Sequence, residues 1–226
     1  MGFIHPDAQW VASPNASTRR NGASPDIILL HYTNMETAEA ALERLCDPEV
    51  GVSSHYLISE SGHLWQMVDE AQRAHHAGVG AWGDVDDVNS RSIGIELANR
   101  GDHAFSEPQM RALEALLPGI MARWSVPAAR VIGHSDMAPE RKIDPGPRFD
   151  WRRLALQGFA VWPIQNGHLP VNADGFRADL RRIGYPDVSD ALLLSSFRLR
   201  FRPWGAGPLD GTDMALARDV AVRWPV

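Results

Sequence analysis

Two histidines and one aspartate lie where the sequence pattern predicts strand ends or a rigid loop. His31 ends the apolar run 26–32, and His134 ends a shorter run that begins at Arg130. Asp144 follows ten residues later, between residues whose prolines restrict the backbone and would hold the carboxylate in place. Two imidazoles and one carboxylate are typical ligands of a catalytic zinc ion, whose fourth position is left to water. Spacing alone leaves open whether the three side chains meet, because a histidine at a strand end is often structural.

The elements expected around these residues alternate between strands and helices. Apolar runs predict strands at 26–32, 55–59, 64–68, 92–99 and 130–134, and the turn between the second and third favours a hairpin. Strands that alternate with helices indicate an α/β fold, here a central mixed sheet flanked by helices.

Two helices are predicted between these strands. Asn34 can cap the first, which ends near Asp47. Ser106, with Gln109 three residues later, is typical of a capping box that opens the second helix. Pro118 is expected to kink or interrupt that second helix.

A composition change near residues 162–167 predicts two domains, 1–163 and 164–226. The second contains three short helical patterns, one ending at Gly184, one over 190–201 and one over 212–223. A unit of about 55 residues buries little apolar surface by itself, so it is expected to lean on the main domain.

Composition bounds the partners. The chain is 44% apolar and 22% charged, as in globular proteins, and its net charge of −6 argues against nucleic acid as a partner. The single cysteine, Cys46, excludes an intramolecular disulfide and is expected to be a half-buried helix residue. No pattern indicates the oligomeric state.

The first residues contain neither the basic nor the apolar region of an export signal, and no apolar run reaches 18 residues. We therefore expect no membrane span. For the sequence as written we expect a cytoplasmic protein, or a periplasmic one if an export signal has been removed. Residues 1–23 otherwise read as an irregular arm.

Four ordered motifs resemble the N-acetylmuramoyl-L-alanine amidase type 2 family, which includes anhydromuramyl-peptide amidases and peptidoglycan recognition proteins. They are His31-Tyr32-Thr33, Ser92-Ile93-Gly94-Ile95-Glu96, Gly133-His134-Ser135-Asp136 and Asp144-Pro145-Gly146-Pro147-Arg148-Phe149-Asp150-Trp151. The resemblance covers about residues 24–155. It implies a zinc hydrolase that cleaves the amide between (anhydro-)N-acetylmuramic acid and L-alanine in peptidoglycan or its fragments.

The resemblance also implies individual roles. His31, His134 and Asp144 would bind zinc, Glu96 would be the general base, and Lys142 would stabilise the oxyanion. A strand-borne glutamate can take a proton from water on the metal. Lys142 lies two residues before Asp144, so in an extended segment both side chains project to one face. The alternatives are a solvated edge glutamate and a surface lysine paired with a neighbouring glutamate.

Substrate contacts are predicted for three further residues. His76 lies in a segment similar to one of the family, although His75 replaces the aromatic residue that usually precedes it. A structural hydrogen bond is the alternative role for His76. Asn89 and Arg91, just before the strand that carries Glu96, are candidates for sugar or peptide contacts.

The C-terminal unit resembles the small peptidoglycan-binding domains that follow some amidases of this family. The similarity rests on residues 180–185, 197–203 and 210–212, and Arg198 stands where a glutamine is usual. Two roles therefore remain open for this unit, binding of the cell wall and stabilisation of the main domain.

Two competing functions also remain. The same fold can bind muropeptides without cleaving them, but a pure binder needs neither the ligand set nor Glu96 and Lys142. A structural zinc site is disfavoured because such sites are four-coordinate and sulfur-rich, and Cys46 is the only thiol. The sequence does not choose between polymeric wall and anhydromuropeptide as substrate, nor does it indicate a stem-peptide preference.

Overall fold

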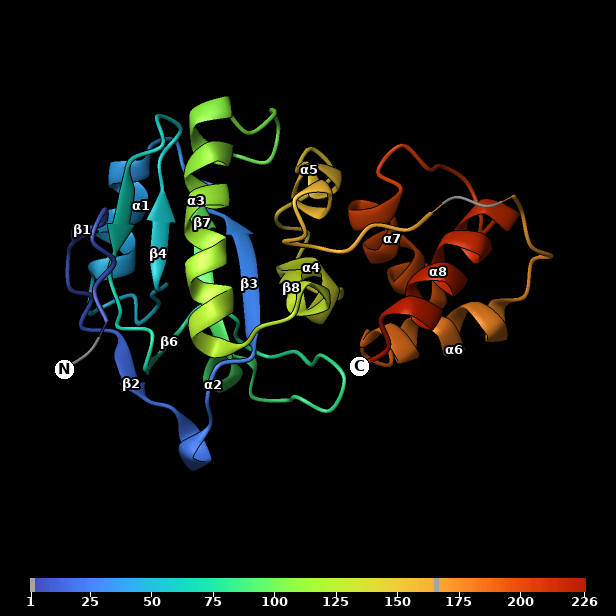
Figure 1. The fold of residues 1–226 in the computed structure, drawn as a ribbon, viewed down its shortest axis with the longest axis horizontal. Helices are drawn as coiled ribbons and strands as arrows, with labels where there is room; N and C mark the ends of the chain where they lie inside the picture. Colours follow the sequence, from blue (N-terminus) through green and yellow to red (C-terminus); the bar gives the residue numbers. More distant parts are fainter. Residues whose placement is uncertain (1–2, 165–166) are drawn as a thin grey trace.

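The computed structural model describes residues 3–164 and 167–226 and is centred on one mixed β-sheet (Figure 1). Within these ranges its strands are β1 (Gln9–Trp10), β3 (Ile27–Tyr32), β4 (Tyr56–Ile58), β5 (Leu64–Gln66), β7 (Ser92–Leu97) and β8 (Val131–Gly133), in the spatial order β1-β5-β4-β7-β3-β8. β4 and β5 form the predicted antiparallel hairpin, whereas β4, β7, β3 and β8 are parallel. A separate antiparallel pair joins β2 (Ala16–Thr18) and β6 (Gln72–Ala74).

Helices cover both faces of this sheet, which confirms the predicted fold class. They are α1 (Ala38–Cys46), α2 (Val88–Arg91), α3 (Glu107–Trp124), α4 (His134–Met137), α5 (Trp151–Leu156), α6 (Ala173–Ile183), α7 (Asp190–Phe201) and α8 (Gly211–Arg223). Figure 1 shows α3 crossing in front of the sheet. It also shows α6, α7 and α8 grouped beside α4 and α5, at the opposite end of the molecule from β1.

The alternation of side chains along β3 divides the core into two parts. Ile28 and Leu30 pack in one cluster with the apolar face of α3. Ile27 and Leu29 point to the other face, where they share a cluster with residues of α4, α6, α7 and α8. The C-terminal helices are therefore packed into the core of the sheet, as the small size of that unit predicted.

The face opposite α3 also carries the chemistry-bearing residues. His31 follows Leu29 by two positions and points to the same face. The parallel pairing of β3 with β7 sets His31 directly beside Glu96. Strand register alone thus brings two predicted site residues together.

Several local predictions are wrong, each because another contact is better. Thr37, not Asn34, caps α1 by accepting the Ala40 N–H, and Asn34 adopts a left-handed conformation with φ 53°. Ser106 caps α3 as predicted, but the Gln109 side chain donates to the Ile58 and Ala98 carbonyls instead of completing a capping box.

Helix α3 also continues through Pro118 from Glu107 to Trp124. The arm predicted over residues 1–23 contributes β1 to the sheet edge and β2 to the second pair. His134 is the first residue of α4, one position beyond the end of β8.

The C-terminal predictions agree closely with the structure. α6 ends before Gly184, α7 spans Asp190–Phe201, and α8 begins one residue before the predicted start. Of the predicted linker at 162–167, residues 165 and 166 lie outside the described residues. Among the residues that the structure describes, no helix is both long and apolar enough to cross a membrane.

Candidate active site

A cavity of about 530 Å³ opens at the carboxyl ends of β3 and β7. Its lining includes six of the eight residues that the sequence singled out: His31, His76, Glu96, His134, Lys142 and Asp144. They come from two strands, from the start of α4 and from the loops at 75–76 and 141–144. The fold therefore gathers at one place residues that are more than 100 positions apart in the chain.

Three buried side chains meet at the bottom of this cavity. The His31 Nδ1 atom lies 2.9 Å from His134 Nδ1, and each of these nitrogens lies 3.0 Å from Asp144 Oδ2. The three donor atoms thus form a nearly equilateral triangle. Each residue offers one ligand atom, and the group is one that could hold a metal ion.

Hydrogen bonds behind the rings determine which nitrogens carry protons. His134 Nε2 donates to the Ala77 carbonyl at 2.8 Å, so its Nδ1 presents a lone pair. Ser92 Oγ donates to the Val88 carbonyl, and it therefore accepts from His76 Nε2 at 3.3 Å. His76 Nδ1 is then the acceptor for His31 Nε2 at 3.0 Å, and His31 Nδ1 also presents a lone pair.

This network leaves two imidazole lone pairs and one carboxylate oxygen facing a common centre. Burial first, and then the neighbouring His134, lower the pKa of His31 to about 4, so the ring is neutral at pH 7. Three electron pairs within 3.0 Å repel one another unless a cation lies between them, so the donor set fits a bound metal ion.

His76 lines the cavity but also has a positioning role. Its ring packs on Gly94, where a Cβ atom would come within 2.6 Å of the imidazole. The side-chain Oδ1 atom of Asn89 accepts from the backbone N–H of His76 and of Ala77 at 3.0 and 2.8 Å. Asn89 therefore holds the loop that supports both metal-facing rings.

Asn89 and Arg91 are the two predicted contact residues that the structure does not bring to the cavity. The Asn89 amide is buried behind the His76 loop. The Arg91 guanidinium pairs with Asp26 and lines a different hollow, near residues 84–87. Their positions give no support to a contact with substrate in the main cavity.

Glu96 lines the cavity, and its side chain is half-buried. Its Oε2 atom is buried and has no hydrogen-bond partner among the described residues. Burial, followed by the nearby charge of Asp144, raises the pKa of Glu96 well above its ordinary value, and Lys142 partly offsets this. An unpaired carboxylate oxygen beside the donor triangle is free to exchange a proton with a bound molecule.

Lys142 lines the same cavity, and its charge acts on both Glu96 and His31. Among the described residues, no carboxylate lies within ion-pairing distance of its ammonium group, so the alternative of a paired surface lysine finds no support. Its positive charge is directed to the cavity instead.

Two further residues near His134 were missed by sequence reasoning. Arg141 lines the cavity and donates from Nε to the Val79 carbonyl at 2.7 Å and from Nη2 to the Ala77 carbonyl. Asp136 is fully buried and accepts from the Gly133 N–H at 2.8 Å. No sequence pattern distinguishes Arg141 from other arginines. Asp136 belongs to the motif Gly133-His134-Ser135-Asp136, but the sequence analysis assigned it no role.

Comparison with known proteins identifies the family of this chain. Residues 21–147 match the family described as N-acetylmuramoyl-L-alanine amidase. The chain belongs to this family and is an enzyme of the amidase class, which confirms the resemblance.

Two curated relatives match this chain over different shares of its length. The N-acetylmuramoyl-L-alanine amidase AmiD of Escherichia coli is 34% identical over 88% of this chain and 83% of its own length. The 1,6-anhydro-N-acetylmuramyl-L-alanine amidase AmpD of Citrobacter freundii is 32% identical over 66% of this chain and 88% of its own length.

Two solved structures extend the similarity to the whole chain. AmiD in complex with anhydro-N-acetylmuramic acid-L-Ala-D-gamma-Glu-L-Lys superposes with a TM-score of 0.81, at 33% identity, over 90% of this chain and 92% of that one. AMPDH3 from Pseudomonas aeruginosa also gives 0.81, at 29% identity, over 100% of both chains.

Proposed function

We propose that this chain is a zinc-dependent amidase that hydrolyses the amide between (anhydro-)N-acetylmuramic acid and L-alanine. The observation that carries the proposal is the buried triangle of His31, His134 and Asp144, whose hydrogen-bond network leaves three electron pairs without a proton. A cavity above it also presents Glu96 and Lys142. The triangle supplies a metal site, and the two other residues supply proton transfer and positive charge.

His31, His134 and Asp144 are the residues that would hold Zn²⁺. When bound, zinc supplies Lewis acidity, which polarises a substrate carbonyl and makes water a stronger nucleophile at neutral pH. Two nitrogens and one oxygen suit zinc better than magnesium or calcium, which prefer oxygen ligands alone. The hydrogen bonds to the Ala77 carbonyl and to His76 keep the two rings in the tautomer that such binding requires.

Glu96 and Lys142 divide the remaining work. Glu96 lines the cavity, and one of its carboxyl oxygens has no hydrogen-bond partner among the described residues. It takes the proton of the attacking water and passes this proton to the departing L-alanine amine. The Lys142 ammonium stabilises the negative charge that develops on the amide oxygen. His31 and His134 remain neutral ligands, so no side chain needs to form a covalent intermediate.

The substrate class follows from the relatives. AmiD was solved with an anhydromuramyl tripeptide as its substrate, and AmpD is named for the 1,6-anhydro form. We propose peptidoglycan or its muropeptide fragments as the substrate here. The alternative, a recognition module that binds without cleaving, does not account for the unpaired carboxylate of Glu96.

We also propose that residues 1–163 form the catalytic domain and 164–226 a peptidoglycan-binding-like helical domain. AmpD relatives match about two thirds of this chain, in agreement with a catalytic unit that ends near α5. The shared hydrophobic cluster of β3, α4 and α6–α8 means that the two units are packed on one core.

The test is to measure zinc content and to identify products by mass spectrometry from intact sacculi and from soluble anhydromuropeptides. Release of free stem peptide, its loss after chelation and its recovery with Zn²⁺ are expected. Asp144→Ala should lose both zinc and activity, whereas Glu96→Gln should keep zinc and lose activity. Full turnover in a sample shown to be free of metal would refute the zinc mechanism, and binding without cleavage would favour the recognition module.

A further inference from the structure

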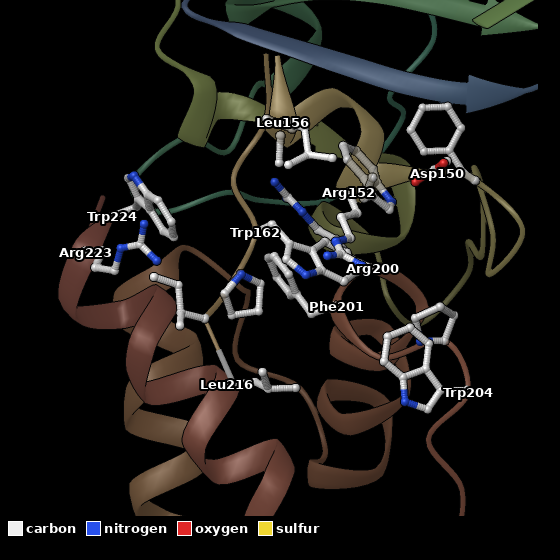
Figure 2. Close-up of a pocket in the computed structure, with 17 residues that line it drawn as sticks. Asp150, Arg152, Leu156, Trp162, Arg200, Phe201, Trp204, Leu216, Arg223 and Trp224 are labelled. Atoms are coloured by element: carbon white, nitrogen blue, oxygen red, sulfur yellow. The ribbon is translucent and has the colours of Figure 1, made fainter. Parts of the chain in front are cut away.

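A second cleft of about 710 Å³ lies at the seam between α5 and the C-terminal helices (Figure 2). It shares no lining residue with the cavity that contains His31, Glu96 and Asp144. Its walls come from the 149–164 segment and from α7, α8 and the residues that follow them. The cleft is therefore a separate feature, formed only where the two units of the chain meet.

Aromatic and aliphatic side chains dominate the walls of this cleft. Four of the eight tryptophans in the chain line it: Trp151, Trp162, Trp204 and Trp224. Trp204 is 68% exposed and Leu156 79% exposed, although side chains of this size and type are usually buried. Figure 2 shows Trp162 and Phe201 between Trp224 on one side and Trp204 on the other. Apolar surface concentrated in a concave site is typical of a place where a ligand binds.

Positive charge accompanies this aromatic surface. Arg152 is exposed on α5, and among the described residues no carboxylate lies within ion-pairing distance of it. The Arg223 guanidinium lies over the Trp224 ring, 4.0 Å from its centroid, and also pairs with Asp219 at 3.0 Å. Among the described lining residues only Asp150 has a carboxylate, and its Oδ1 atom caps α5 by accepting the Arg153 N–H. Arg152 therefore gives this cleft an exposed positive charge that no carboxylate of the described residues neutralises.

We propose that the cleft binds a second segment of a peptidoglycan strand, away from the amide that is cleaved. This inference rests on the proposed function, which supplies a polymer of sugars and acidic stem peptides as the partner. A sugar ring has an apolar face and a polar rim, and it matches the exposed faces of Trp204 and Trp162. A stem-peptide carboxylate matches the exposed guanidinium group of Arg152.

Binding at two places would change how polymer and fragment are treated. A strand held in the cleft keeps its neighbouring amide bonds at a high effective concentration near the catalytic cavity. A soluble anhydromuropeptide is too small to occupy both sites and gains nothing from this effect. The cleft is thus a determinant of preference for the polymer.

Co-sedimentation with purified sacculi tests the proposal in the Glu96→Gln background, in which hydrolysis is slow. We expect Trp204→Ala to raise the apparent Kd for sacculi about tenfold, and Arg152→Ala to raise it several-fold. Trp10→Ala is the matched control, because Trp10 is an exposed tryptophan, 40% accessible, on β1 at the far edge of the sheet. It should bind sacculi as the parent does.

In the active chain, Trp204→Ala should raise KM for sacculi more than KM for the soluble fragment, with kcat little changed. Equal sacculus binding by the Trp204→Ala, Arg152→Ala and Trp10→Ala proteins would overturn the proposal, as would a parent that does not co-sediment. A change of oligomeric state in Trp204→Ala, measured by sedimentation velocity, would make the cleft a self-association surface and would also overturn it. Failure of the wild-type chain to cleave either substrate counts against the proposed function alone, because co-sedimentation does not need hydrolysis.

Discussion

Asp136 and Asp144 lie eight residues apart and are both buried, yet their surroundings differ in kind. Asp136 accepts from the Tyr185 hydroxyl at 2.6 Å and from Arg200 at 2.8 Å, so its charge is fully paired. Asp144 faces two imidazole nitrogens that present lone pairs. A buried charge whose hydrogen bonds are all made indicates a structural role. Buried lone pairs that face one another without a proton between them indicate a binding site for a cation.

The hydrogen bonds around Asp136 connect the C-terminal helices to the part of the chain that lines the catalytic cavity. Ser196 donates to the Ser135 carbonyl at 2.6 Å, and Arg200 also donates to the Val131 carbonyl at 3.0 Å. These contacts enclose the turn that carries His134. Arg198, which departs from the binding-domain pattern, is buried in an ion pair with Asp213 and so serves the helical unit itself. The contrast between the two regions predicts different failures when each is changed.

Removal of residues 164–226 should have the largest effect, because it opens the shared cluster and removes Tyr185 and Arg200, the partners of Asp136. Each large apolar side chain that becomes exposed costs about 1.5–3 kcal/mol, so the total loss of stability should exceed about 5 kcal/mol. Thermal unfolding followed by circular dichroism, together with soluble yield, measures the effect. A truncated chain that melts at the wild-type temperature would show that the sheet does not need the helices.

Glu96→Gln should lower turnover by roughly 10²–10⁴-fold, the range expected on loss of a general base. Zinc content and melting temperature should stay near those of the wild type, since the amide has the same size and Oε2 has no hydrogen-bond partner to lose among the described residues. Unimpaired turnover would return Glu96 to a structural role.

Arg200→Met should destabilise the chain by about 3–5 kcal/mol, because the buried Asp136 carboxylate loses its counter-charge. Adding Asp136→Asn should recover part of this loss, since the second change removes the unpaired charge. Chemical denaturation of the two single variants and the double variant gives the coupling energy. If the stability losses of the two single variants simply add in the double variant, Asp136 and Arg200 do not interact, and Asp136 is not the paired charge described above. Zinc affinity of stable samples would report whether the His134 turn has moved.

Glu70→Gln should have the smallest effect, about 2 kcal/mol at pH 7. Burial raises the pKa of Glu70, but hydrogen bonds from Arg123, Tyr56 and Trp124 outweigh it, and the net pKa is lowered. The pKa of Glu70 is lower in the folded state than the unfolded value of about 4.3, so its charge stabilises the fold above that pH. This stabilisation is lost as the pH falls through the folded-state pKa. The stability difference from wild type should therefore be largest at neutral pH and shrink below about pH 4. A difference that is constant from pH 7 to 3.5 would contradict the pairing.

The sequence by itself determined the elements whose signal is local and repeated. Apolar runs predicted β3 and β7. Helical patterns predicted the end of α6 and the bounds of α7 and α8 to within one residue. The ordered motifs identified His31, His134, Asp144 and Glu96 as candidates, because a motif depends only on residue identity and order, which the sequence contains.

Only the tertiary structure decided which side chains meet and which are already taken. His31 lies 103 and 113 positions from its partners, and no local rule measures such a distance. Arg91 is an equally plausible contact in sequence, but its guanidinium is held by Asp26. One cap prediction also failed: Thr37, not Asn34, caps α1, because Asn34 lies outside the first turn of the helix. The tryptophan cleft exists only where two units separated in the chain are packed together, because neither half of the chain carries all of its walls.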